Sequence, residues 1–259
     1  MDEYNLKQIS KYLESHKDYL INYDFNRIYQ DTYNEDWVSM CIRDMTNIFY
    51  IAGLDPLKYL DHVPADYLYL DDKRESIDIP NEGIKYIDRS AFFNCTSLKY
   101  IKIPDSVTYI YSSAFEGCCK ANIDFGNSLE IIDERAFAHC YALKDLVLPK
   151  SLKTISAEAF AMCRDLTRVV LPKDLYYIDT NAFRFCTELN TVMWNAKFVQ
   201  LGKDIFKDCA QIHKKPININ YSYSKRDFTY IVKESLDNFH FDTPIIVKCT
   251  DGELQYGDR

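Results

Sequence analysis

The sequence predicts an α+β fold built as a solenoid of about six repeats of roughly 23 residues with parallel strands. A helical cap is expected before the repeats and a strand-helix-strand cap after them. The first observation is a cysteine that recurs at intervals of 23, 22, 23, 23 and 23 residues. Its six copies are Cys95, Cys118, Cys140, Cys163, Cys186 and Cys209. A fixed period of this length is typical of stacked repeats.

The second observation is the apolar pattern that follows each cysteine. In the first unit Ile101 and Ile103 alternate with Tyr100 and Lys102, which predicts a strand with two apolar side chains on one side. Pro104 then ends the strand because proline cannot donate to a ladder. The Ala-Phe-x-x-Cys stretch before each strand predicts a single helical turn with Phe and Cys on one side. Stacking such units gives a continuous core.

Three units depart from the pattern. The unit at Cys118 lacks one residue and ends in Gly126 instead of proline, and the first unit carries an extra residue near Gly83. After Cys186, Trp194 and Asn195 stand where the strand end and the proline are expected.

The units read much as IPxSVxxIxxxAFxxCxxLxxI and resemble the BspA-like leucine-rich repeats over roughly residues 75–212. Many members have glycine after the second apolar position, where this chain has mostly other residues. These are Asp88, Tyr111, Asp133, Ser156 and Asp179, and only Gly202 conforms. The resemblance implies a leucine-rich-repeat solenoid and, in many members, a role as a surface adhesin.

The pattern changes at both ends, which is the third observation. Residues 1–74 are expected to form a helical N-terminal cap domain, with helical spacing over 6–13 and 37–48 and a third helix from Asp55-Pro56. Residues 213–259 are expected to form the C-terminal cap. Its elements are a strand over 217–221, a helix over 224–236 with Ser224 and Asp227 as a capping box, and a last strand over 245–249. This ending is similar to that of many BspA-like proteins, and the short helical head resembles intracellular members from phages and mobile elements.

Charge narrows the class of partner. The net charge is −8, of which residues 1–74 carry −6 (8 Lys+Arg, 14 Asp+Glu) and the remainder −2 (23 and 25). We therefore expect no direct binding to nucleic acid or to anionic lipid, because both need a basic face. No apolar run approaches the roughly 18 residues of a membrane span, and the polar N-terminus is unlike a secretory signal, so we expect the cytoplasm.

The sequence offers little for catalysis. The cysteine ladder lacks any Cys-x-x-Cys, and we interpret it as a buried stack of small side chains rather than a metal or redox site. A nucleophilic pair of His139 and Cys140 is disfavoured because adjacent side chains point in different directions. We expect no catalytic, metal or cofactor site.

The remaining candidates for function are surface residues that could bind a partner. The repeats place outward residues in three rows. The first two rows, on the strands after each cysteine, are Tyr100, Asn122, Asp145, Arg168 and Thr191, and Lys102, Asp124, Val147, Val170 and Met193. The third row, after each proline, is Tyr86, Tyr109, Ile131, Thr154 and Tyr177. Tyr, Val and Met neighbours on an outward face predict contact with a partner unless the C-terminal cap folds over them.

The leading hypothesis is a non-enzymatic protein-binding module that uses this outward strand face. One alternative is an intracellular inhibitor of a host defence or nucleic-acid-acting enzyme, encoded by a phage, that binds through the acidic residues 1–74. The other is a surface adhesin. The identity of the partner and the oligomeric state are left open by the sequence.

Overall fold

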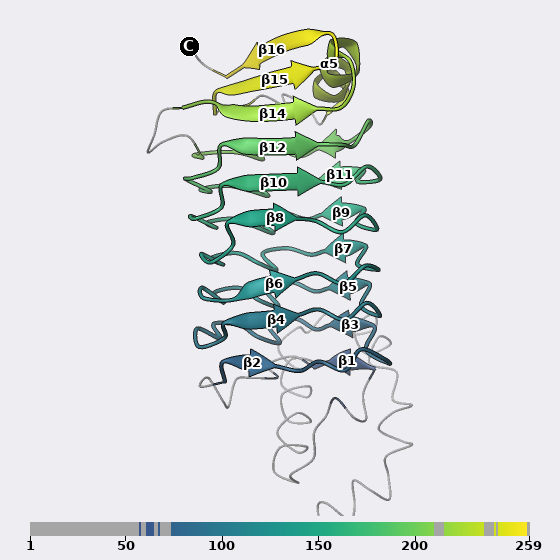
Figure 1. Cartoon of the computed structure of the whole chain (residues 1–259), viewed down its shortest axis with the longest axis vertical. Coiled ribbons are helices and arrows are strands. Elements are labelled where there is room, and N and C mark those ends of the chain that lie inside the picture. The colour runs from purple at the N-terminus through teal and green to yellow at the C-terminus, as the bar shows by residue number, and fades with distance from the viewer. Residues whose placement is uncertain are drawn as a thin grey trace, which may run out of the picture.

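The computed structural model describes residues 57, 61–64, 67, 74–209, 215–235, 241 and 243–257. Over these residues the chain winds into a β-solenoid of about six turns of roughly 23 residues, stacked along one axis (Figure 1). The helices predicted within residues 1–74 lie almost entirely outside the described residues. The sequence predicted an α+β fold; in the described part of the chain the fold is mainly β, with one α-helix.

Each turn of the coil contributes one strand to the face that carries the first two rows. These strands are β2 (Ser76–Ile77), β4 (Tyr100–Lys102), β6 (Asn122–Asp124), β8 (Asp145–Val147), β10 (Arg168–Leu171) and β12 (Thr191–Trp194). Neighbours that pair do so in parallel, for example β8 with β10 and β10 with β12. The predicted alternation is confirmed: Ile101 is buried between exposed Tyr100 and Lys102.

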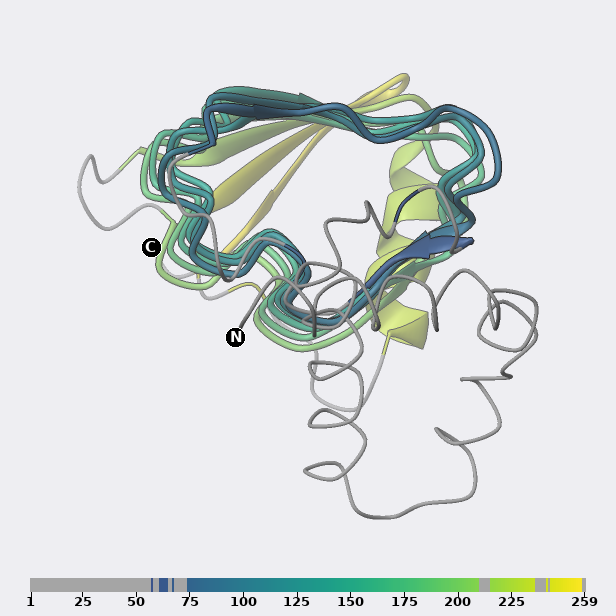
Figure 2. The same ribbon diagram turned by 90° about the horizontal axis from the view of Figure 1, so that it is seen from below.

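A second short strand in each turn builds another face. The strands are β1 (His62–Val63), β3 (Tyr86–Ile87), β5 (Tyr109–Ile110), β7 (Ile131–Ile132), β9 (Thr154–Ile155), β11 (Tyr177–Ile178) and β13 (Gln200–Leu201). They form one parallel seven-stranded sheet. Viewed along the axis, the two sets of strands lie on different sides of the coil (Figure 2).

A column of phenylalanine rings runs through the core between these faces. Its members are Phe92, Phe115, Phe137, Phe160, Phe183 and Phe206. Successive rings are stacked with centroids 4.9 to 5.8 Å apart. The ladder cysteines are buried beside them, as the sequence predicted.

The single helical turn predicted for Ala-Phe-x-x-Cys is wrong, because the backbone there makes consecutive tight turns. Ser90 and Asn94 have positive φ values of 55° and 56°, and the same two positions repeat along the solenoid. These left-handed residues aim the Phe92 N–H at the Ala114 carbonyl of the next repeat, 2.7 Å away. Hydrogen bonds between repeats therefore replace those that a helix would make within itself.

The C-terminal segment extends the strand face. β14 (Ile217–Tyr221) pairs in parallel with β12, and β15 (Ile245–Cys249) pairs in parallel with β14. The predicted helix is α5 (Lys225–Glu234), which begins at Ser224 with the expected capping box to Asp227. The prediction that 245–249 is the last strand is wrong: the chain reverses, with Gly252 at a φ of 131°, into the antiparallel strand β16 (Gly252–Tyr256).

The strand face is not one sheet, which corrects the expectation of unbroken rows from Tyr100 to Thr191 and from Lys102 to Met193. β2, β4 and β6 form a three-stranded sheet, whereas β8, β10, β12, β14, β15 and β16 form a six-stranded one. Figure 1 shows the interruption between β6 and β8. The break falls at the unit that lacks one residue.

Candidate protein-binding surface

The first outward row is polar where it crosses the six-stranded sheet. Asp145, Arg168 and Thr191 lie in register on β8, β10 and β12. The Arg168 Nη1 atom donates to both carboxylate oxygens of Asp145, at 2.8 and 3.1 Å. Because the pair is exposed, it adds little stability and leaves charged groups accessible to a partner.

The second outward row carries an apolar stripe, which we define as Val147, Val170 and Met193. Val170 is in register with Val147 on one side and with Met193 on the other. Val147 is 57% exposed, and Val170 and Met193 are half-buried. Beyond Met193 the row becomes polar at Asn220, whose amide lies 3.4 Å from the Met193 sulfur. The stripe is a short apolar patch with polar borders.

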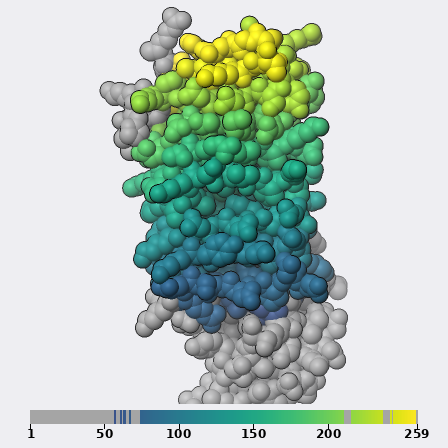
Figure 3. Space-filling model, in the orientation of Figure 1, coloured from purple at the N-terminus to yellow at the C-terminus, as the bar shows by residue number. Residues whose placement is uncertain are grey.

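The described C-terminal elements do not cover this stripe. β14 continues the sheet beside β12, and α5 contacts β13 and β16. Figure 1 shows α5 at the C-terminal end of the coil, and Figure 2 shows that it does not lie over the outer surface of β8, β10 and β12. Phe228 and Ile231 of α5 are buried in the core, where the Phe228 ring meets Trp194 at 5.6 Å. Figure 3 shows the same face in space-filling form, with the repeats as successive bands.

Tyr100 and Lys102, also predicted to bind, lie on the separate three-stranded sheet. Tyr100 is 47% exposed, and its hydroxyl donates to Asp124 at 3.3 Å. Both side chains face outward, on the same side of the coil as the stripe but across the break. The structure therefore places the predicted residues of the first two rows in two groups.

The tyrosines of the third row lie on the seven-stranded sheet and not with the others. Tyr86 and Tyr109 are half-buried and pack around Tyr111, with ring centroids 5.7 and 4.3 Å away. Burial, with the charge of Asp179 and a hydrogen bond to it, raises the pKa of Tyr177. These residues cannot share one flat binding face with the stripe, because they belong to the other side of the coil (Figure 2).

Sequence reasoning missed a groove at the break. A pocket of about 600 Å³ lies between β6 and β8. It is lined by Ile123, Asp124, Phe125, Asn127, Leu143, Asp145, Leu146, Val147, Leu148, Pro149 and Lys150. The missing residue and Gly126 were the signals that could have located it.

A second missed feature is an exposed aromatic pair near α5. Phe198 and Tyr230 are both more than half exposed, and their ring centroids are 6.3 Å apart. Phe198 follows a repeat that has lost its proline, and Tyr230 lies on α5, so no repeat pattern connects them.

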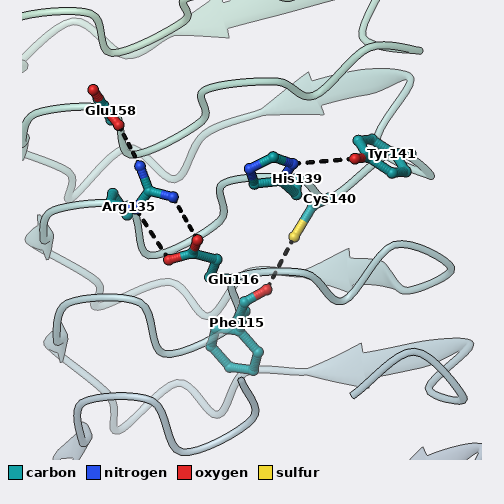
Figure 4. Close-up of polar contacts among 7 residues, drawn as sticks. All are labelled: Phe115, Glu116, Arg135, His139, Cys140, Tyr141 and Glu158. Carbon is teal, nitrogen blue, oxygen red and sulfur yellow. Dashed lines mark hydrogen bonds and ion pairs between the residues drawn. The ribbon is translucent and has the colours of Figure 1, made fainter. Parts of the chain in front are cut away.

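His139 and Cys140 are neighbours in the sequence but make separate contacts (Figure 4). The Cys140 thiol donates to the Phe115 carbonyl at 3.2 Å, while His139 Nδ1 lies 3.1 Å from the Tyr141 hydroxyl, so the two side chains have different partners. Burial raises the pKa of the Cys163 thiol to about 12. Within the described residues, no cluster of His, Cys, Asp or Glu could hold a metal ion.

Arg135 joins three repeats through ion pairs (Figure 4). It contacts both carboxylate oxygens of Glu116, at 2.5 and 3.1 Å, and one oxygen of Glu158 at 2.5 Å. Burial alone would raise the pKa of Glu116, but hydrogen bonds from Arg135 and Ser113 and the Arg135 charge outweigh it, so the pKa is lowered.

The stacked turns, parallel strands and buried Phe and Cys columns define a leucine-rich-repeat solenoid. The chain belongs to the BspA type leucine rich repeat family, whose sequence pattern matches residues 63–190 and 153–246. No curated protein sequence matches the chain. No helix among the described residues is long and apolar enough to cross a membrane.

Among the solved structures that resemble the chain, one has a TM-score above 0.5 and supports the same fold. The pneumococcal vaccine antigen PcpA is 18% identical with a TM-score of 0.51, and the match covers 70% of this chain and 41% of that one. A leucine rich repeat protein from T. pallidum is 24% identical with a TM-score of 0.46, covering 63% and 86%. A leucine rich cell surface protein from Faecalibacterium prausnitzii is 24% identical with a TM-score of 0.47, covering 68% and 43%.

Proposed function

We propose that this chain is a non-enzymatic module that binds another protein on the outward face of β8, β10 and β12. The observation that carries the proposal is the apolar stripe Val147, Val170 and Met193, which lies in register on three strands and is left open by the described C-terminal elements. Contiguous apolar residues on an outer surface usually mark contact with a partner.

The surroundings of the stripe support a protein partner. Asp145, Arg168 and Thr191 border it on one side, which gives an apolar centre with a polar rim. The pair of Asp145 and Arg168 offers both signs of charge within 2.8 Å. Nucleic acid is disfavoured as a ligand, because phosphate binding needs a cluster of basic groups and the chain has a net charge of −8.

We propose the cytoplasm as the location. The ladder cysteines support this proposal, because their thiols donate to carbonyl oxygens of the preceding repeat and a reducing compartment keeps thiols reduced. Cell fractionation with an antibody to the native protein tests this proposal, and recovery from the cell surface would support the adhesin alternative instead.

The test of the binding face uses Val170→Asp with Met193→Asp. Both side chains point outward and are half-buried at most, so the solenoid is expected to fold, as checked by its melting temperature. Affinity purification from the native cell, with mass spectrometry of the copurified proteins, should lose the partners that the wild type retains.

A matched control adds the same charge elsewhere. Ser128→Asp with Gln200→Asp places two carboxylates on exposed positions outside the stripe. This control should retain the wild-type partners. If the stripe variant also retains them, the partner binds elsewhere.

A further inference from the structure

The break between β6 and β8 exposes strand edges in the middle of the solenoid. Every other pair of neighbouring strands on this face is hydrogen-bonded in register, whereas the described residues show no strand pairing between these two. The groove of about 600 Å³ occupies the interval. It is a property of this one repeat and not of the repeats in general.

Packing at the end of β6 explains the break. A Cβ atom on Gly126 would lie 2.2 Å from the Pro104 carbonyl oxygen, so only glycine lets the chain lie this close to the preceding repeat. The core position occupied by Leu98, Leu143 and Leu166 elsewhere is Ala121 here. The shortened unit therefore packs closely against the preceding repeat, and no strand pair joins β6 to β8.

The hydrogen bonds that do form identify which backbone groups face the groove. On β6, the Asn122 N–H donates to Lys99 and the Asp124 carbonyl accepts from Ile103, so both residues face β4. Because backbone groups alternate along a strand, Ile123 faces the groove.

The same reasoning applies to β8. The Lys144 carbonyl accepts from Thr167, and the Leu148 N–H donates to Val170, so these residues face β10. Asp145 and Val147 therefore present their N–H and carbonyl groups to the groove. The edges of β6 and β8 therefore each present backbone N–H and carbonyl groups to the groove. An exposed edge of this kind is a template for another strand.

The groove is lined by apolar side chains, by two carboxylates, Asp124 and Asp145, and by one amine, Lys150. Ile123 and Phe125 are only half-buried, while the equivalent Ile101 and Ile103 of the preceding repeat are buried completely. The Phe125 ring lies edge-on to Phe137 at 5.3 Å. On the outer surface, Asp124 belongs to one edge and Asp145 to the other.

We propose that this groove binds an extended peptide segment of the partner protein, which inserts as a strand between β6 and β8. The inference rests on the proposed function, since it assumes a protein partner, and it names how part of that partner is held. The segment pairs with the Ile123 backbone on one side and with Asp145 and Val147 on the other. Its inward side chains are apolar, to meet Ile123 and Phe125, and its outward ones are basic, to lie beside Asp124 and Asp145.

The first test measures the binding of a defined probe to the full chain. The probe is a fluorescein-labelled peptide, TVKVKVT, with blocked ends, followed by fluorescence anisotropy. Saturable binding is expected, with at least a tenfold weaker affinity for the acidic peptide TVEVEVT and for TVKPKVT, whose proline lacks a ladder donor. Failure of the first peptide to bind, or equal affinity for all three, would overturn the proposal.

The second test closes the groove by repairing the shortened repeat. Residues 119–126 are replaced with the nine-residue sequence of residues 141–149, which restores the missing residue, the leucine and the proline. The repaired chain should lose peptide binding by at least tenfold. The matched control puts the same nine residues in place of residues 164–172, which have the same length, but keeps Arg168 because it pairs with Asp145 at the groove; it should bind like the wild type.

Hydrogen exchange keeps the proposal testable if the repaired chain does not fold. On addition of TVKVKVT to the wild type, amides within 121–125 and 143–148 should exchange more slowly, and those within 191–194 should not change. Unchanged exchange at Ile123 and Val147 would refute strand insertion.

The outcomes separate this inference from the proposed function. The variant with Val170→Asp and Met193→Asp keeps both edges of the groove and should bind the peptide normally. Peptide binding by that variant with no loss of cellular partners would reject the stripe and leave the groove. Loss of partners with no peptide binding by the wild type would reject the groove and leave the stripe.

Discussion

The Cys163 sulfur lies 3.2 Å from the carbonyl oxygen of Phe137 in the preceding repeat. The same contact joins Cys118 to Phe92, Cys140 to Phe115, Cys186 to Phe160 and Cys209 to Phe183, at 3.0 to 3.2 Å. The cysteine ladder is therefore a column of hydrogen bonds between repeats. A thiol suits this place because it is small, largely apolar and still a weak donor.

Cys163→Ala should destabilise the fold by about 1–3 kcal/mol, because it leaves a small cavity and removes the donor from a buried carbonyl. Urea unfolding measures the change. Cys119→Ala is the control, since Cys119 lies beside the ladder and is partly exposed, and it should stay within about 0.5 kcal/mol of the wild type. Equal effects of the two changes would show that the column adds nothing.

Alkylation should separate the thiols in the same way. Burial raises the pKa of Cys163 to about 12 and also raises the pKa of Cys140, so neither forms appreciable thiolate at neutral pH. Iodoacetamide should modify Cys119 before any ladder thiol in the native protein, as read by peptide mass mapping. Modification of Cys140 as fast as Cys119 would contradict the burial described.

Acid should weaken the contact between Glu116 and Arg135. The Glu116 pKa is lowered in the folded chain, so its contribution is complete above the ordinary value of 4.5 and is lost as the pH falls through the lowered pKa. Glu116→Gln should cost about 1 kcal/mol at neutral pH, a modest figure because Arg135 is 36% exposed. The free energy of unfolding, measured in urea, should fall less between neutral and acidic pH for the variant than for the wild type. An identical decline would assign the acid sensitivity to other groups.

The phenylalanine column should hold the repeats together. Phe160→Ala removes a ring stacked at 5.4 Å on Phe137 and on Phe183, and should cost about 3–5 kcal/mol. Thermal unfolding gives the measurement. The exposed ring of Phe198 provides the comparison, because Phe198→Ala is expected to change stability by about 0.5 kcal/mol at most.

Gly126→Ala tests the cause of the break. The added Cβ would meet the Pro104 carbonyl oxygen, so the backbone must shift. The free energy of unfolding should then fall by about 1–3 kcal/mol. The free energy of unfolding in urea is the measurement. Full wild-type stability would show that the approach of β6 to β4 does not depend on this glycine.

Much of the architecture follows from local pattern. The period of the cysteines determines the stacking, and the alternation around Ile101 determines which side chains enter the core, because side chains alternate along any strand. The capping box at Ser224 and Asp227 likewise fixes the start of α5 from neighbouring residues. The expectation of a helical turn failed because residues such as His139 and Met162 adopt positive φ, which their identities do not announce.

The sequence by itself determined the repeat, its register and its buried columns, since these depend on residues within one period. Only the tertiary structure decided that the strand face divides between β6 and β8, that the tyrosine row lies on another face, and that α5 leaves Val147, Val170 and Met193 open. Those features depend on contacts between repeats, such as Gly126 against Pro104. A single missing residue was visible in the sequence, but the side toward which the shortened strand moves is set by its neighbours in space.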